Sequence, residues 1–276
     1  MPVPPEIRAA LASYGFETRR IELVSPLRER KGLRMAYRAE GADGRVIKAR
    51  HCTSEDEART LLELRAALEP AFAPVVARHG CVLLEEWIEG EPIAPERAES
   101  RAEEAGELLG RLHTTELPRD TAATCSTERW RWNGHSDIEL LARADALAGA
   151  DAERLVARLD REDPREARVS LVHRDFCGEN MVVDSRGRLR LIDNERVGID
   201  ASGFDLGWTF HRWPMSSRAW SRFLGAYRKV APSTEALAFW QIAAALTCSR
   251  VFLQRMPERL PESLARLRRF AAEGGA

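Results

Sequence analysis

The chain has 276 residues, of which 44% are hydrophobic and 31% are charged, and its net charge is −1. This balance is typical of a globular protein with a sizeable core, and it argues against a nucleic acid or an anionic membrane surface as partner. The length suits two lobes that share a cleft.

Five cysteines are scattered along the chain without a Cys-x-x-Cys motif. Their odd number argues against a disulfide framework or a zinc site and favours free thiols in a reducing cytoplasm. The N-terminal stretch lacks the order of a signal peptide, and the longest apolar stretch, residues 236–248, is too short to span a bilayer. We therefore expect a cytoplasmic protein without a membrane segment, in which residues 236–248 form a buried helix.

Residues 1–90 predict a small lobe of mixed structure. The turn GADG at 41–44, flanked by alternating residues, indicates a hairpin. Ser54 and Glu57 form a capping-box pattern at the start of an apolar periodicity. The expected elements are a short helix at 5–14, strands within 21–50, a helix at 54–68 and a strand at 81–93 that runs into a turn.

Residues 91–276 predict a larger and mostly helical lobe. Apolar residues recur at helical spacing in three successive segments and again from residue 203 to the end. The expected elements are helices at 101–117, 137–150 and 151–163, a polar loop within 171–183, a strand within 189–195 and the C-terminal helices.

The stretch LVHRDFCGENMVV, residues 171–183, places His173, Arg174 and Asp175 between two apolar runs, and Asn180 follows Asp175 by five positions. The segment LRLID then returns as the second strand of a hairpin and ends at Asp193. Asp175, Asn180 and Asp193 are therefore able to converge on one point.

Such a convergence suits phosphoryl transfer. Asn180 and Asp193 offer oxygen ligands to Mg²⁺, which takes one or two carboxylates and leaves its other positions to phosphates and waters. Asp175 is placed to accept a proton from an attacking hydroxyl or to orient it, so that catalysis consists mostly of positioning and charge neutralisation. The alternative is a polar hairpin whose Asp and Asn satisfy backbone groups of the turn.

LVHRDFCGENMVV, LRLIDNE and GFDLGW together resemble the aminoglycoside phosphotransferase and choline kinase family, which are small-molecule kinases of the protein-kinase-like fold. The resemblance covers nearly the whole chain and is sharpest over residues 171–208. It implies an α+β bilobal fold, with an antiparallel sheet in the small N-lobe and a mostly helical C-lobe. It also implies that ATP and Mg²⁺ are bound and that the γ-phosphate moves to a hydroxyl of a small-molecule acceptor.

The resemblance assigns roles to individual residues of the loop. Asp175 would be the catalytic base, Asn180 and Asp193 would be the Mg²⁺ ligands, His173 would brace the loop, and Asp205 would hold it through backbone contacts. The family more often has Gly after this His, whereas Arg174 stands here.

Lys48 is one of only three lysines among 42 basic residues, and it ends the strand-like segment VIK. A compact ammonium suits the α- and β-phosphates as a point charge. The resemblance gives it Glu57 as partner, with Glu55 and Glu63 as competitors for that role. The alternative is a surface lysine and a glutamate that only caps a helix.

The segment LLEEWIEGEPI resembles the family's hinge, and we expect the contact with adenine at Glu86 and Ile88. The phosphate-covering loop departs from the family pattern, because SPLRERKGLRMAY at 25–37 contains a single glycine, Gly32. Basic side chains in this loop would compensate, or the segment is a solvated turn.

The acceptor pocket is expected between the helical segment at about 95–165 and the C-terminal helices. Aromatic faces would hold a quaternary ammonium, although tryptophans also pack in cores, and clustered acids would hold a polycationic aminoglycoside. The candidates are Trp130, Trp132, Trp208, Trp213 and Trp220 for the aromatic faces, and Asp137, Glu139, Asp200 and Glu262 for the acids. His113 matches a Leu-His pair of the family and is expected to pack. The acceptor and the oligomeric state stay open.

Two other functions stay open as alternatives. A nucleotide-binding pseudokinase or regulatory module of the same fold is favoured by the thin glycine loop and opposed by the intact set of Lys48, Asp175, Asn180 and Asp193. A protein kinase is favoured by the His-Arg-Asp motif. It is opposed by the short interval from Asp193 to Asp205, which leaves no room for a long regulatory segment.

Overall fold

The computed structural model describes residues 3–24, 35–66, 71–93, 97–213, 215–231 and 236–273. The chain divides into two compact units, which we call unit 1 (Met1–Ile93 and Glu179–Gly198) and unit 2 (Ala94–Gly178 and Ile199–Ala276). In the described ranges no helix is both long enough and apolar enough to cross a membrane.

Unit 1 is built on a five-stranded antiparallel sheet with the strand order β1-β2-β3-β5-β4. Its strands are β1 (Thr18–Leu23), β2 (Ala36–Gly41), β3 (Val46–His51), β4 (Val75–His79) and β5 (Val82–Glu86). β2 and β3 pair through the turn that contains Gly44 at φ 81°, which confirms the hairpin predicted at residues 41–44.

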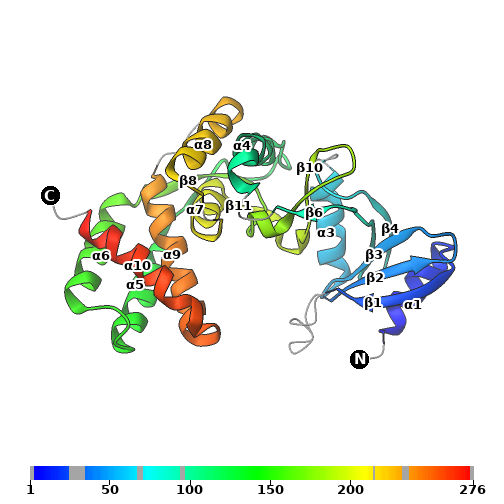
Figure 1. Ribbon diagram of the computed structural model, residues 1–276, viewed down its shortest axis with the longest axis horizontal. Coiled ribbons are helices and arrows are strands. Elements are labelled where there is room, and N and C mark those ends of the chain that lie inside the picture. The colour runs from blue at the N-terminus through cyan, green and yellow to red at the C-terminus, as the bar shows by residue number, and fades with distance from the viewer. Residues whose placement is uncertain are drawn as a thin grey trace. The chain divides into compact units, whose positions relative to one another are not determined.

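Two helices pack against opposite faces of this sheet (Figure 1). Ile7 and Leu11 of α1 (Pro5–Ser13) are buried against Tyr37, Ala39 and Ile47. The opposite face carries side chains of even number on β3, because successive residues of a strand point to opposite sides. α3 (Glu55–Ala66) lies on that face, and its position confirms the helix predicted to begin at Ser54.

A second, three-stranded sheet completes unit 1. It has the order β10-β9-β6 and consists of β6 (Glu91–Pro92), β9 (Met181–Val183) and β10 (Leu189–Leu191). The pairing of β9 with both neighbours explains why residues 179–198 group with unit 1 although they lie far along the chain. The division into lobes at residues 90 and 91 stays a prediction.

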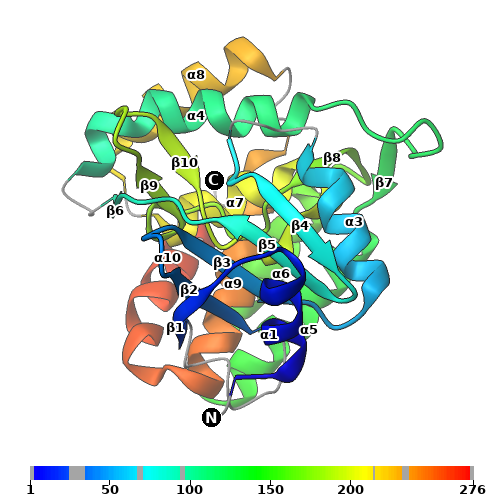
Figure 2. The same cartoon turned by 90° about the vertical axis from the view of Figure 1, so that its right-hand side faces the viewer.

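Unit 2 is mostly helical (Figure 2). Its helices are α4 (Ala98–Thr114), α5 (Glu128–Arg143), α6 (Gly149–Glu162), α7 (Ser202–Arg212), α8 (Ser217–Val230), α9 (Leu237–Arg255) and α10 (Leu260–Ala272). A short sheet of β7 (Thr124–Ser126), β8 (Glu166–Val172) and β11 (Gly198–Ala201) lies among them. The antiparallel sheet of unit 1 and the helices of unit 2 confirm the predicted α+β fold class.

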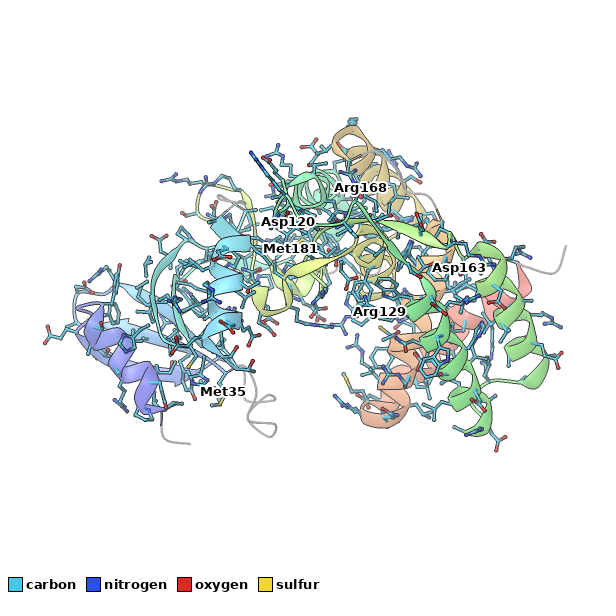
Figure 3. All side chains as sticks on the ribbon, turned by 180° about the vertical axis from the view of Figure 1, so that it is seen from behind. Met35, Asp120, Arg129, Asp163, Arg168 and Met181 are labelled. Carbon is cyan, nitrogen blue, oxygen red and sulfur yellow. The ribbon has the colours of Figure 1, made fainter. Side chains whose placement is uncertain are left out.

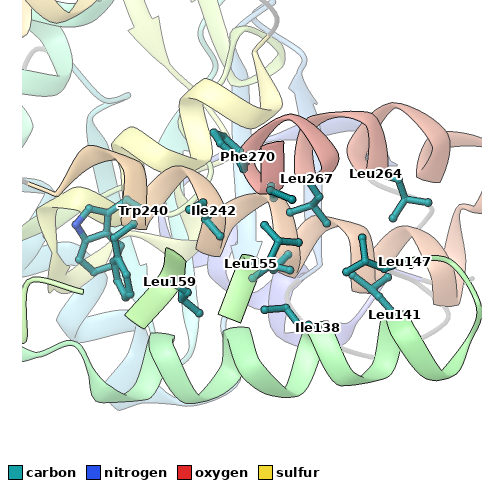
Figure 4. Packing of buried hydrophobic residues seen from close by; sticks show 14 of the residues in the cluster. Ile138, Leu141, Leu147, Leu155, Leu159, Trp240, Ile242, Leu264, Leu267 and Phe270 are labelled. Atoms are coloured by element: carbon teal, nitrogen blue, oxygen red, sulfur yellow. The ribbon is translucent and has the colours of Figure 1, made fainter. Parts of the chain in front are cut away.

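The main core of unit 2 lies between α5, α6, α9 and α10 (Figure 4). Leu155, Leu159, Phe239 and Leu246 are fully buried in it, and α9 confirms the buried helix predicted at residues 236–248. The predicted boundaries of α5 were wrong: it begins at Glu128 and not at 137, because the Trp-rich start of the helix hides the helical period. α4 packs closely along α8, where Gly106 touches the backbone of Phe223.

Candidate active site

A cavity of about 400 Å³ lies within unit 1. Five of the residues singled out in the sequence line it, namely Lys48, Glu86, Ile88, Asn180 and Asp193. They come from β3, from the end of β5, and from the two ends of the β9–β10 hairpin. The structure therefore brings together groups that are up to 145 residues apart in the sequence.

Lys48 lies on β3 directly opposite Glu85 of β5, but the two side chains do not pair. Arg50 Nε lies 2.9 Å and Arg65 Nη1 lies 2.7 Å from the same Glu85 carboxylate oxygen. Arg50 also reaches Glu195, at 3.2 Å. The two arginines thus pair with Glu85, the acid opposite Lys48 in the sheet. The Lys48 ammonium has no ion-pair partner among the described residues.

The electrostatics of this group follow from its burial. Burial raises the pKa of Glu85, but the charges of Arg50, Arg65 and Lys48 outweigh it and hold that pKa well below its usual range. Burial, with Arg50 as the next cause, lowers the pKa of Lys48 to about 8, while Glu85 and Asp193 act in the opposite direction. Lys48 is therefore a cation that gains from the arrival of an anion in the cavity.

Glu57, the partner expected for Lys48, caps α3 in the structure. Its carboxylate accepts a hydrogen bond from the backbone N–H of Thr53 at 2.7 Å, and its own N–H donates to Ser54 Oγ at 3.1 Å. The bond to Ser54 is the one that the predicted capping box requires, whereas the Glu57 carboxylate reaches Thr53, one residue before Ser54. The acid that acts most on Lys48 is Glu85, so the role of Glu57 toward a ligand stays a prediction.

The hinge residues lie at the exit of β5. The backbone N–H of Glu86 is bonded to the carbonyl of Pro74 at 2.9 Å, and that of Trp87 to the carbonyl of Val46 at 3.3 Å. The N–H of Ile88 has no hydrogen-bond partner in the part of the chain that the structure describes, and Ile88 lines the cavity. The contact of this segment with adenine stays a prediction.

Asn180 and Asp193 are held next to each other by the backbone. The N–H of Ile192 donates to the carbonyl of Asn180 at 2.9 Å, and both side chains line the cavity. Asp193 adopts a left-handed backbone conformation with φ 57°, which is unusual for a residue with a Cβ and typical of functional sites. Most of the predicted phosphate-covering loop, residues 25–34, lies outside the described residues.

The part of the loop up to Gly178 belongs to unit 2, where Asp205 holds the His173–Arg174 backbone. Its carboxylate accepts hydrogen bonds from the N–H groups of His173 and Arg174 at 2.6 and 2.7 Å. His113 Nε2 lies 3.3 Å from the same carboxylate, and His113 Nδ1 lies 2.9 Å from the Tyr227 hydroxyl. His113 therefore packs in a satisfied network. Burial raises the pKa of Asp205, but the hydrogen bond and charge of His113, with His173, lower it overall.

Asp175 is held by Trp208 of α7. The indole Nε1–H donates to Asp175 Oδ1 at 2.9 Å. Thr209, the next residue, donates its hydroxyl to the carbonyl of Phe176 at 2.9 Å. α7 therefore fixes both the backbone and the carboxylate of the loop, whereas the catalytic roles of Asp175, His173 and Asp205 stay predictions.

Arg174 adopts a left-handed backbone conformation with φ 63°, where glycine fits without strain. Its guanidinium donates to the carbonyl of Ile199 at 3.2 Å and to the carboxylate of Asp200 at 3.1 Å. These contacts tether the side chain and offset the local strain.

Sequence reasoning missed two parts of this site. One is the group of Arg50, Arg65 and Glu85 behind Lys48. Its signal was the spacing of Lys48 and Arg50, which are two residues apart on one strand and therefore lie on the same face of the sheet. The other is the hydrogen bond from Trp208 to Asp175, for which the sequence carries no signal.

The model of the phosphotransferase enzyme family matches residues 36–240. No curated protein sequence matches the chain.

Many solved structures share the fold, and three of them are described here. The choline kinase LicA from Streptococcus pneumoniae is 16% identical with a TM-score of 0.68, over 95% of this chain and 96% of that one. The macrolide 2′-phosphotransferase MphH from Brachybacterium faecium is 18% identical with a TM-score of 0.63, over 98% of each chain. A putative fructosamine-3-kinase from Thermobifida fusca is 19% identical with a TM-score of 0.63, over 99% and 100%.

The matched region spans β2 through the start of α9 and includes the residues that line the cavity from Lys48 to Asp193 together with the His173–Asp175 loop. Since it covers most of the chain, we conclude that this protein belongs to the phosphotransferase enzyme family.

Proposed function

We propose that the protein is an ATP- and Mg²⁺-dependent kinase that transfers the γ-phosphate to a hydroxyl of a small molecule. The observation that carries this proposal is the cavity of unit 1, because it gathers Lys48, Asn180 and Asp193 with the hinge at Glu86 and Ile88. A cation, two oxygen ligands and a backbone donor that has no partner in the described ranges are the groups that a nucleotide with a metal ion requires.

ATP fits the chemistry of this cavity. The ammonium of Lys48 suits the phosphates as a point charge, and the N–H of Ile88 suits an acceptor nitrogen of the adenine ring. The structure of the choline kinase LicA in complex with AMP supports an adenine nucleotide in this fold. The nearby Arg50 contributes through the field that it creates and not through contact, since its guanidinium is committed to Glu85 and Glu195.

Mg²⁺ fits the donor set as well. Asn180 and Asp193 supply one amide and one carboxylate oxygen, and Mg²⁺ commonly binds with one or two carboxylates while substrate phosphates and waters complete its shell. The described residues contain no cluster of three or more His, Cys, Asp or Glu side chains that would hold a metal ion. When bound, the ion would neutralise the charge of the phosphates.

Asp175 would act as the base toward the acceptor hydroxyl. The bond from Trp208 engages Oδ1 and fixes the plane of the carboxylate. Asp205 supports the same loop from the backbone. The residues of this chain therefore orient the carboxylate, and catalysis would depend on positioning more than on covalent chemistry.

The test is the variant Asp175→Asn, assayed by ADP release with a panel of hydroxyl acceptors. A positioned general base contributes about 10²- to 10⁴-fold, so kcat should fall by that order while ATP affinity, measured by thermal shift with and without Mg²⁺, stays unchanged. Asp151→Asn, on the surface of the same unit in a pair with Arg154, serves as control. Full activity in Asp175→Asn would exclude the proposed role.

The same assays separate a kinase from a nucleotide-binding module. Binding of ATP that depends on Mg²⁺, without ADP release on any acceptor, would favour the module.

A further inference from the structure

The two proposed metal ligands are held in different ways. Asn180 directly precedes Met181, the first residue of β9 (labelled in Figure 3). Because β9 pairs with β10 on one side and with β6 on the other, the backbone of this sheet fixes Asn180. Asp193 lies beyond Leu191, where the pairing of β10 has ended. Its position therefore depends also on the segment that follows.

The segment that follows Asp193 is a short 3₁₀ helix, η3 (Asn194–Arg196). Asp193 itself has a left-handed backbone conformation with φ 57° and ψ 46°, which costs free energy in a residue with a Cβ. Such a conformation persists only where the surroundings hold it. Asn194 and Glu195 are buried, with exposed fractions of 2% and 3%. These two side chains anchor η3 in the interior of unit 1, and Asp193 with it.

Glu195 is anchored to the strand that carries Lys48. The Nη1–H of Arg50 donates to Glu195 Oε2 at 3.2 Å. Arg50 follows Lys48 by two positions on β3, so both side chains lie on the same face of the sheet. One strand therefore carries both the ammonium proposed for the phosphates and the guanidinium that anchors the segment of Asp193.

A second acid fixes the guanidinium of Arg50. Its Nε–H donates to Glu85 Oε1 at 2.9 Å, and β5 carries Glu85 next to β3. The planar fork of an arginine binds two acids in a fixed geometry, which the single ammonium of a lysine does not reproduce. Because a buried charge without its partner is costly, Arg50 keeps both contacts. The place of Glu195 relative to β3 is thereby fixed.

We propose that Arg50 is a positioning residue, which holds Asp193 at the cavity by its contact with Glu195. The inference rests on the proposed kinase function and adds a residue on which Mg²⁺ binding depends although it does not touch the ion. Asp193 is among the described residues that line the cavity and Arg50 is not, so Arg50 acts through Glu195. Removing a group that orients a metal ligand from outside typically lowers metal affinity by about 10- to 100-fold.

The test uses two variants that conserve charge and change the reach of a side chain, Arg50→Lys and Glu195→Asp. Isothermal titration calorimetry measures the dissociation constant of ATP in EDTA and in excess Mg²⁺, and the ratio of the two constants reports how strongly the ion supports binding. We expect each variant to lower this ratio by about tenfold, while the dissociation constant in EDTA stays unchanged. The double variant should lower the ratio no further than either single variant, because both act through one contact.

Two controls separate this role from a general loss of stability. Arg65→Lys is the same substitution in an arginine that binds the same Glu85 oxygen and has no contact with Glu195 in the described part of the chain. Leu11→Ala opens a cavity in the apolar core of unit 1, where Leu11 is fully buried. Both should lower the melting temperature, and neither should change the ratio.

The outcomes distinguish this inference from the proposed function. An unchanged ratio in Arg50→Lys, or a higher one because Glu195 then reaches the ion itself, would overturn the inference. An equal fall of the ratio in Arg65→Lys or Leu11→Ala, or loss of ATP binding in EDTA in both test variants, would also overturn it, since the ion pair would then only stabilise the fold. If Mg²⁺ does not strengthen ATP binding in the unmodified protein, the proposed function itself fails.

Discussion

Both units contain an apolar core, but the side chains behind Lys48 in unit 1 form a buried ionic group, whereas the main core of unit 2 is apolar throughout. In unit 1, Arg50 and Glu85 are each only 1% exposed and form an ionic group behind Lys48. In unit 2, the main core is an apolar cluster among α5, α6, α9 and α10 (Figure 4). A buried ionic group is costly unless its charges are paired, whereas apolar packing is stabilising in itself. The stability of unit 1 should therefore depend on the pairing of these buried charges.

Among the variants that test this comparison, Glu85→Gln is expected to change the free energy of unfolding most. This change keeps the shape of the side chain but leaves the buried Arg50 and Arg65 with less compensation. We expect the free energy of unfolding to fall by about 3–5 kcal/mol, measured by chemical denaturation. Asp56→Asn, which removes an exposed pair with Arg59, should change it by about 0.5 kcal/mol or less. Equal small effects in both variants would mean that the ionic group does not matter for stability.

The matching change in unit 2 is Leu159→Ala. Leu159 is fully buried, so the loss should be about 2–5 kcal/mol from lost burial and a cavity. A Cβ added at Gly134 would meet Leu159 Cδ2 at 2.5 Å. Gly134→Ala should therefore destabilise the unmodified protein, yet stabilise Leu159→Ala by about 1 kcal/mol, because alanine favours a helix over glycine. The same sign in both backgrounds would contradict this packing.

A smaller effect is expected from Trp208→Phe, which removes the hydrogen bond to Asp175 and keeps an aromatic ring. A hydrogen bond to a charged group contributes about 1.5–3 kcal/mol, so kcat should fall at least about tenfold while KM for ATP stays constant. Trp220→Phe, whose ring stacks on Phe223, is the control. A change in KM for ATP alone would argue against this role for Trp208.

The smallest effect concerns the pH dependence of ATP binding. The pKa of Lys48 is about 8 without ligand, and a bound phosphate raises it by favouring the charged form. ATP affinity should therefore be highest below pH 8 and should weaken as the pH rises through 8, by at most about tenfold per pH unit. Titrations at several pH values check this, and Lys48→Met should remove the dependence. A flat profile in the unmodified protein would contradict the depressed pKa.

Local signals made much of unit 1 predictable from its sequence. Signals that act over a few residues predict two of its elements. The GADG turn and the apolar alternation of its flanks predict the β2–β3 hairpin, and Ser54 with Glu57 predicts the start of α3. The sequence predicted that Asp175, Asn180 and Asp193 converge. Asn180 and Asp193 line one cavity together with Lys48, whereas the convergence of Asp175 with them stays a prediction. The start of α5 was missed, because the segment from Glu128 to Asn133 has no clear apolar period, and its helix depends on packing of Trp130 against Trp240.

The long-range contacts were not predictable in the same way. Glu85 binds Arg65 because β5 and α3 meet in space, and no spacing in the sequence encodes that meeting. The contact between Glu57 and Ser54 was predicted, but that Glu85 is the acid acting most on Lys48 depends on the register of β3 and β5. The bond from Trp208 to Asp175 depends on how α7 approaches the loop.

The left-handed backbone of Arg174 has a consequence for redesign of the loop. Glycine adopts this conformation freely, so Arg174→Gly removes the tether to Asp200 without forcing the loop into another shape. Freed in this way, Asp200 keeps its ion pair with Arg129 and its bond from the Ala201 N–H, and it gains negative character. One substitution would thus change the charge of the surface beside Asp175 while leaving its backbone intact, which makes this position a natural starting point for altering which acceptors the protein accepts.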